Sequence, residues 1–241
     1  MQAWRRRLDQ GLNIQPGEGP AVIAGLLLFY LLFTGYFMLR PVRETMGIAG
    51  GVRNLQWLFT GTFVATLVAI PLFGLVASRV RRRRILPWTY GFFALNLLGF
   101  AAAIASAPDN PWVARGFYVW LSVFNLLAIS VAWSVLADVF AAAQAKRLFA
   151  LMAAGASAGG LLGLLLGVLL VGPLGHAGLM VLATALLLAS AGAAVVLQRW
   201  RDHHPLGAGE TLARREPLGG NPFAGLTTVF SSPYLMGIAT F

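Results

Sequence analysis

Residues 20–40 read PAVIAGLLLFYLLFTGYFMLR, an apolar stretch that ends at an arginine. An α-helix needs about 20 such residues to cross the hydrocarbon core of a bilayer, which is about 30 Å thick. Similar stretches follow along the chain, at about 54–77, 85–106, 111–137, 148–171 and 176–197. We therefore expect an all-α membrane protein with six transmembrane helices.

The composition of the whole chain supports this class. Hydrophobic residues make up 58% of the 241 residues and charged residues 11%, and the mean hydropathy is +0.75. A soluble domain carries about 25% charged residues, so these charges are too few for a surface that faces water. The chain has no cysteine, which excludes disulfide scaffolds, thiolate catalysis and cysteine-ligated metals.

The basic residues are distributed unevenly. The net charge is +10, and such a balance in a soluble domain points to nucleic acid. Here the 18 lysines and arginines lie at or between the ends of the apolar stretches, and all but Arg40, Arg43, Arg53 and Arg115 share the side of the N-terminus. Because positive residues favour the cytoplasmic side, we predict a multi-pass inner (plasma) membrane protein with a cytoplasmic N-terminus, the lipid bilayer as its partner and no nucleic-acid partner.

The polar segments divide the chain into parts. We predict a cytoplasmic N-terminal tail over 1–19, the six-helix bundle over 20–198 and a cytoplasmic central loop over 199–225. Residues 226–241 read LTTVFSSPYLMGIATF and begin another apolar stretch. We interpret this stretch as the start of a truncated seventh helix, which makes a C-terminal six-helix half, missing from this chain, a predicted partner.

Four glycines recur at a strict four-residue spacing in the fifth stretch: Gly155, Gly159, Gly163 and Gly167. Residues four apart lie on one face of a helix, and small residues let two helix backbones approach closely in lipid. Two interpretations remain open. The glycine face forms a static helix–helix contact, or it offers a smooth surface on which helices of the missing half slide.

Cations also occur where topology does not require them. Arg40 and Arg43 lie three residues apart on the predicted outer side, with Glu44 beside them and Tyr36 one turn earlier. One interpretation is that the arginines extend to the outer interface and Glu44 neutralises one of them. The other is an anion-binding cluster, since a guanidinium presents a planar fork of donors suited to phosphate or carboxylate.

The fourth stretch carries a polar stripe of Tyr118, Ser122 and Asn125, followed by Trp133. Such a stripe either hydrogen-bonds a neighbouring helix or lines a watery path. We favour the path for this stripe, with Asn125 and Trp133 as substrate-binding residues. We find no metal-site, phosphate-loop or nucleophile motif. We therefore predict no enzyme activity, no cofactor and no metal.

The gap at 74–87 reads GLVASRVRRRRILP. It resembles the loop between helices 2 and 3 of the major facilitator superfamily, roughly G-x-L-A-D-R-x-G-R-R, at Gly74, Ala77, Arg79, Arg82 and Arg83. The resemblance implies that Gly74, Arg79 and Arg82 belong to an inner gate, although Ser78 stands where the family has aspartate. A plain positive-inside anchor is the alternative.

The gap three helices later holds Asp138, Lys146 and Arg147, as a three-plus-three repeat would place it. Asp138 either supplies the carboxylate that position 78 lacks, which makes these three residues part of the gate, or belongs to an interfacial charge cluster.

Residues 35–74 and 123–163 resemble helices 1–2 and 4–5 of the nucleotide (NTP/NDP) exchange carriers within the same superfamily. The resemblance implies a secondary carrier that works by alternating access on a small anionic solute, with Arg40 and Arg43 in the region where those carriers place phosphate-binding lysines. Two other classes remain open: a non-transporting membrane scaffold, and a lipid-handling protein whose arginines hold headgroup phosphates.

Overall fold

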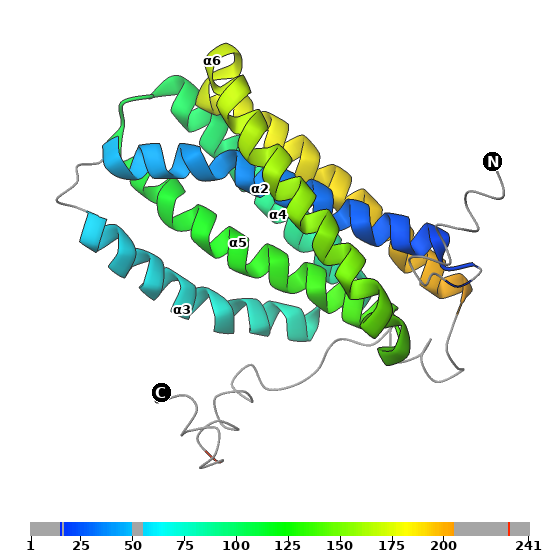
Figure 1. The fold of residues 1–241 in the computed structure, drawn as a ribbon. Coiled ribbons are helices and arrows are strands. Elements are labelled where there is room, and N and C mark those ends of the chain that lie inside the picture. Colours follow the sequence, from blue (N-terminus) through cyan, green and yellow to red (C-terminus); the bar gives the residue numbers. More distant parts are fainter. Residues whose placement is uncertain (1–14, 16, 50–54, 205–230, 232–241) are drawn as a thin grey trace.

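The computed structural model describes residues 15, 17–49, 55–204 and 231. They contain five long helices: α2 (Gly19–Ala49), α3 (Leu55–Arg79), α4 (Arg82–Ser106), α5 (Pro111–Val139) and α6 (Ala142–His203). Figure 1 shows the helices lying side by side along a common direction, as a bundle. Each is long and apolar enough to cross a membrane.

Helix α6 contains two of the predicted spans. Its 62 residues include a kink at Gly175, where φ is 65° and ψ is −179°, and the chain turns back on itself there (Figure 1, yellow). We call residues 142–174 the first arm and 176–203 the second arm. A positive φ favours glycine because a Cβ would crowd the backbone. The described chain thus has five helices, and the count of six and the three-plus-three repeat stay predictions.

Several predicted helix boundaries were wrong, among them the start of the fifth helix, which was expected at 148, whereas α6 begins at Ala142. Helix α2 does not end at Arg40 but continues through Pro41 to Ala49, where the Thr45 hydroxyl donates to the Pro41 carbonyl at 3.0 Å. A chain that left the helix at membrane depth would expose unpaired backbone groups to lipid, which favours continuing past the proline. Helix α4 begins at Arg82, three residues before the predicted start at 85.

The second arm of α6 ends at His203, so the predicted central loop, 199–225, begins within a helix. Residues 205–225 lie outside the described residues. So does the predicted seventh-helix segment, 226–241, apart from Ser231.

Helix α2 packs against both arms of α6. The Ser190 hydroxyl of the second arm donates to the Leu28 carbonyl at 2.9 Å, and both groups are buried. On the first arm, the glycine face meets the backbone of α2 at Leu26, Tyr30, Thr34 and Met38. Both sets of positions rise in steps of four, so the two helices run parallel and in register.

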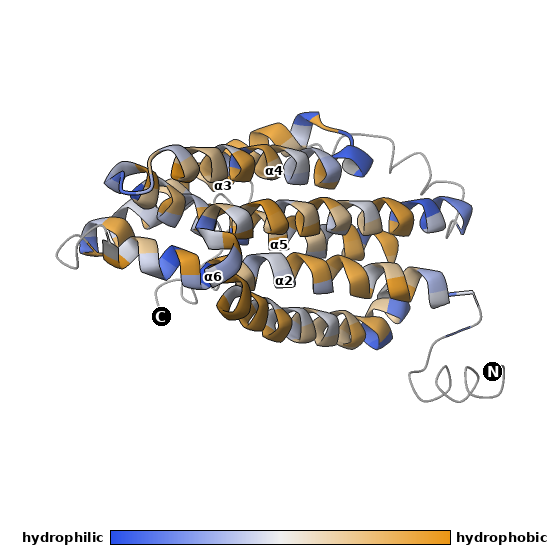
Figure 2. Ribbon diagram, turned by 90° about the horizontal axis from the view of Figure 1, so that it is seen from above, coloured by the Kyte–Doolittle hydropathy of each residue, from blue (hydrophilic) through white to orange (hydrophobic). Residues whose placement is uncertain are grey.

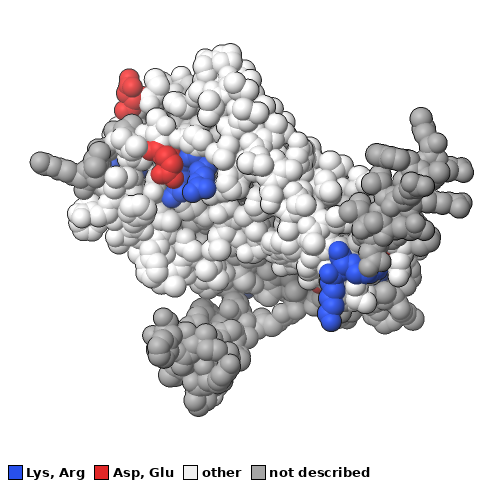
Figure 3. All heavy atoms as spheres, viewed as in Figure 1, with Lys and Arg blue, Asp and Glu red and all other residues white. Residues whose placement is uncertain are grey.

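The surface divides into an apolar middle and polar ends. Figure 2 shows hydrophobic residues along the helices and hydrophilic ones at their ends, and Figure 3 shows charged atoms gathered at two ends of one face with an uncharged band between them. Helix α3 lies at the edge of the bundle beside α5 (Figure 1), and none of its most apolar window is buried. This pattern is what a hydrocarbon solvent selects.

Candidate functional site

Helices α2 and α5 run antiparallel and form a seam with three layers. Phe29 meets Trp133 at one level, with ring centroids 4.6 Å apart, and Arg43 meets Tyr118 at another. Seven residues separate Tyr36 from both Phe29 and Arg43, a rise of about 10 Å in each direction. By the same count Asn125 lies midway between Trp133 and Tyr118. The seam therefore has an aromatic layer, a polar layer and a cationic layer.

Arg43 forms the cationic layer. Its guanidinium carbon lies 4.1 Å from the ring centroid of Tyr118, which is a close cation–π contact. Its Nη1 lies 3.2 Å from Oε1 of Glu44, and the Arg43 side chain is 16% exposed against 53% for Glu44. The Arg43 Nε is buried and has no hydrogen-bond partner among the described residues. One donor of a mostly buried guanidinium thus remains available.

The structure brings part of the predicted anion-binding cluster together around Tyr36. Arg40, Arg43 and Glu44 all act electrostatically on the phenol of Tyr36, which is half-buried and packs edge-on against Phe37. Arg40 itself is exposed, with its guanidinium carbon 5.7 Å from the Phe37 centroid. Arg40 therefore lies at the rim, whereas Arg43 lies within the seam.

On α5, Asn125 is half-buried and its Oδ1 is buried without a partner in the described part of the chain. Buried polar atoms are normally hydrogen-bonded, so an orphaned amide oxygen indicates a position for water or a ligand. Trp133 is engaged differently, because its ring also packs 5.4 Å from Phe149 of α6. Trp133 closes the seam by packing, and Ser122 donates within its own helix to the Tyr118 carbonyl.

The end of the bundle where α2 begins contains a buried carboxylate that we did not predict. Glu18 is 4% exposed and accepts from the Gln15 N–H at 3.0 Å, from Gln144 Nε2 at 2.8 Å and from Arg147 Nη2 at 3.1 Å. Burial raises the pKa of this carboxyl, but the hydrogen bonds from Gln15, Gln144 and Arg147 and the charge of Arg147 hold it below its ordinary value. Glu18 is therefore ionised at neutral pH.

Further contacts join the helix ends at this same end of the bundle. Arg83 Nη1 of α4 lies 3.0 Å from Asp202 Oδ2 of the second arm, and the Trp200 indole N–H donates to the Gly17 carbonyl at 3.0 Å. The segment before α2 thus contacts both the start and the end of α6. We call Glu18–Arg147, Arg83–Asp202 and Trp200–Gly17 the end contacts.

The other predicted gate residues lie close by. Gly74 is in α3, Arg79 is its exposed last residue, and Lys146 is exposed near the start of α6. Asp138 is half-buried at the end of α5. Arg82 begins α4, and its side chain lies outside the described part of the structure.

Among the described residues, Glu18 is a carboxylate in contact with Arg147. The sequence could have indicated Glu18 as a candidate, because it is the single acid between Asp9 and Glu44 and directly precedes an apolar stretch.

The four glycines of the first arm, Gly155, Gly159, Gly163 and Gly167, are buried and face α2. A Cβ at Gly155 would lie 3.0 Å from the Leu26 carbonyl oxygen, and one at Gly167 would lie 2.9 Å from that of Met38. At Gly159 and Gly163 a Cβ would overlap the carbonyls of Tyr30 and Thr34. The glycine face therefore lies against the backbone of α2 within this bundle.

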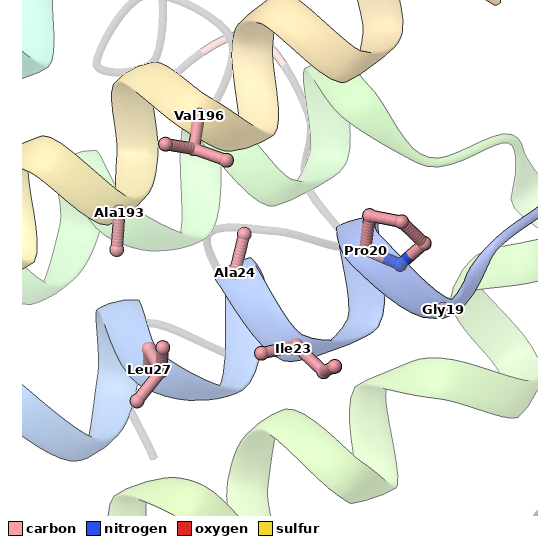
Figure 4. Close-up of a pocket in the computed structure, with 7 residues that line it drawn as sticks. All are labelled: Gly19, Pro20, Ile23, Ala24, Leu27, Ala193 and Val196. Carbon is pink, nitrogen blue, oxygen red and sulfur yellow. The ribbon is translucent and has the colours of Figure 1, made fainter.

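A cavity of about 600 Å³ lies between the start of α2 and the second arm of α6. Figure 4 shows its lining, Gly19, Pro20, Ile23, Ala24, Leu27, Ala193 and Val196. None of these side chains is polar, so this cavity lacks the groups that orient a charged solute. In the described part of the chain no group of three or more His, Asp or Glu is placed to hold a metal.

Comparison with known proteins gives one match. The family model described as Major Facilitator Superfamily matches residues 21–241. No curated protein and no solved structure matches the chain. The matched region includes every helix described above, and the family consists of membrane transporters. With its apolar helices, the chain is a multi-pass membrane protein of the transporter type, and it belongs to the Major Facilitator Superfamily.

Proposed function

We propose that this chain forms the N-terminal half of a secondary carrier that moves a small anionic solute, of the phosphate-bearing or nucleotide class, across the inner membrane by alternating access. The proposal rests on the environment of the Arg43 side chain. A guanidinium that is 16% exposed, stacked on Tyr118 and left with a buried unpaired Nε, is costly at membrane depth unless it serves a partner.

The remainder of the seam gives that cation a substrate path. Asn125 lies about 10 Å deeper, by the rise of seven helical residues, and offers an unpaired acceptor to a hydroxyl, amine or water of the solute. Glu44 pairs with Arg43 from an exposed position, and such pairs contribute little, so an incoming anion can replace it. Arg40, which is exposed beside the seam, would add to the positive field that attracts the anion.

Alternating access requires an end of the bundle that opens and closes. In our proposal the end contacts Glu18–Arg147 and Arg83–Asp202 hold the helix ends of this half together, so that this end moves as one body when it separates from the second half. The second half would rock against this one about the seam. The predicted gate residues Gly74, Arg79, Arg82, Asp138 and Lys146 lie beside these contacts and complete the proposed gate.

The substrate assignment is tested by anion binding and uptake in proteoliposomes. Radiolabelled phosphate, ADP and ATP serve as probes, with a choline salt as the cationic comparison. Loss of a hydrogen bond to a charged group costs about 1.5–3 kcal/mol, so Arg43→Ala should weaken anion binding about 10- to 100-fold.

Arg115→Ala is the matched control for that experiment. Arg115 is also half-buried, and its guanidinium lies 5.0 Å over the Trp112 ring, but it is outside the seam. Arg115→Ala should leave affinity within about threefold, the scale of a screened surface charge. Equal affinities for wild type and for both Arg40→Ala and Arg43→Ala would refute the anion site.

The orientation is tested separately, using the absence of cysteine from the chain. A single cysteine at exposed Lys146 or at exposed Asp109 reports which side each position faces. In intact spheroplasts a membrane-impermeant maleimide should label Asp109→Cys and leave Lys146→Cys unlabelled until the membrane is opened. The reverse pattern would contradict the predicted cytoplasmic N-terminus.

A further inference from the structure

A second pocket lies at the turn between α3 and α4, and of its lining residues the transport proposal uses Arg79 alone. It is an open pocket of about 570 Å³, lined by Arg79, Val80, Arg81, Arg84 and Trp88. The geometry points to a binding site for an anionic lipid, with the headgroup phosphate held by the three arginines. Basic pockets between transmembrane helices are suited to such headgroups.

Among the described residues, the arginines of this pocket have no carboxylate partner. Arg83, in the same turn, pairs with Asp202, but the described residues place no carboxylate within ion-pair distance of Arg79, Arg81 or Arg84. Three uncompensated cations around one cavity repel each other, and a phosphate relieves that repulsion while accepting from several guanidinium donors at once.

The N-terminus of α4 also favours an anion in this pocket. Its N-cap, Arg81, makes no side-chain capping bond, and of the first-turn donors the Arg84 N–H donates to the Arg81 carbonyl at 2.8 Å. A helix N-terminus presents free N–H groups and the positive end of the helix dipole, and both favour an anion. The cavity therefore combines side-chain charge with backbone donors.

The surroundings favour a lipid over a free anion. Trp88 lines the cavity and is 66% exposed, and tryptophan prefers the membrane–water interface. Below the cavity, the last two turns of α3 expose the apolar side chains of Leu72, Leu75 and Val76. An anionic lipid can use both surfaces, with its phosphate among the arginines and its acyl chains along α3, whereas inorganic phosphate can use only the first.

The test is lipid binding to the purified 241-residue chain, counted by native mass spectrometry in detergent. The probes are phosphatidylglycerol and phosphatidylcholine with identical acyl chains. The wild-type chain should retain phosphatidylglycerol in preference. Each arginine near a membrane surface contributes about 1 kcal/mol, so Arg81→Gln combined with Arg84→Gln should weaken phosphatidylglycerol binding about 30-fold and leave phosphatidylcholine binding unchanged.

The control combines Arg83→Gln with Arg199→Gln, which removes the same charge from the same end of the bundle but outside the cavity. It should change phosphatidylglycerol binding by less than about threefold. Equal losses in the two double variants would overturn the site in favour of diffuse attraction. An absence of lipid preference in the wild type would overturn it without any variant, and displacement of the lipid by millimolar inorganic phosphate would overturn the lipid assignment in favour of a free-anion site.

Discussion

The contact between α2 and the first arm of α6 depends on a glycine that has no room for a methyl group. A Cβ at Gly159 would overlap the Tyr30 carbonyl oxygen, with the Tyr30 carbonyl carbon at 2.9 Å and its Cα at 3.0 Å. These are backbone atoms, so no change of rotamer can relieve the overlap. Gly159→Ala must push the two helices apart along a parallel contact that continues from Leu26 to Met38.

The size of the effect follows from two opposing terms. Overpacking of a closely packed contact costs about 1–3 kcal/mol, and a clash with backbone atoms takes the upper part of that range, about 2–3 kcal/mol. Replacing a mid-helix glycine by alanine returns about 1 kcal/mol of helix propensity. The net loss is about 1–2 kcal/mol. For a chain of this size each kcal/mol shifts the thermal midpoint by about 2–4 °C, so the expected decrease is about 2–8 °C.

Gly160→Ala is the matched control because it makes the same change one residue along the same helix. Its Cβ would lie 3.4 Å from Phe37 Cδ2, an ordinary contact with a side chain that can move. Its midpoint should equal or exceed that of wild type. Melting is followed by tryptophan fluorescence in one detergent at a fixed lipid content. If Gly159→Ala melts with the wild type, or Gly160→Ala melts below it, the register between α2 and the first arm is wrong.

Three further substitutions test other parts of the bundle. Because the folded-state pKa of Glu18 is lowered, its stabilisation is present above the unfolded value of about 4.3 and is lost as pH falls through the folded value. Glu18→Gln should therefore lower the free energy of unfolding by about 2 kcal/mol at neutral pH. It should also reduce the loss of stability that the wild type shows as the pH falls. An unchanged loss of stability at acid pH would contradict the Glu18–Arg147 contact. Gly175→Ala should cost about 1–2 kcal/mol through its positive φ, whereas Gly172→Ala, equally open but without a positive φ, should be neutral; equal melting of the two would contradict the kink. Tyr90→Phe removes a buried hydrogen bond to the Ala128 carbonyl at 3.0 Å and should lower the free energy of unfolding by about 1 kcal/mol in a denaturant titration, with a cost near zero counting against that bond.

Some of the candidate site is recognisable in the amino-acid sequence. The positions of Arg40, Arg43 and Asn125 stand out because polar side chains are costly in apolar stretches, and the structure places Arg43 and Asn125 on the α2–α5 seam. The relation between them is not recognisable there, since the stacking of Arg43 on Tyr118 joins residues of two different helices. The same applies to Glu18, whose partner Arg147 is 129 residues away along the chain.

The helix ends show where local reasoning fails. We expected the first helix to end at Arg40, yet α2 runs on to Ala49, because in lipid the cost of unpaired backbone outweighs that of one missing N–H. The reversal in α6 occurs at Gly175, between the predicted spans 148–171 and 176–197.

Composition was sufficient to establish that this is a helical membrane protein, because a bilayer acts on each span by its length and apolar character, whatever the span's neighbours. Helix-to-helix pairing could not be established in this way. The glycine spacing of the first arm indicated a close approach, but it did not name the carbonyls of Tyr30 and Thr34 as the surface approached. A hydrocarbon solvent does not favour one apolar face over another, so the choice of partners rests on backbone fit and on a few polar contacts that exist only once the chain has folded.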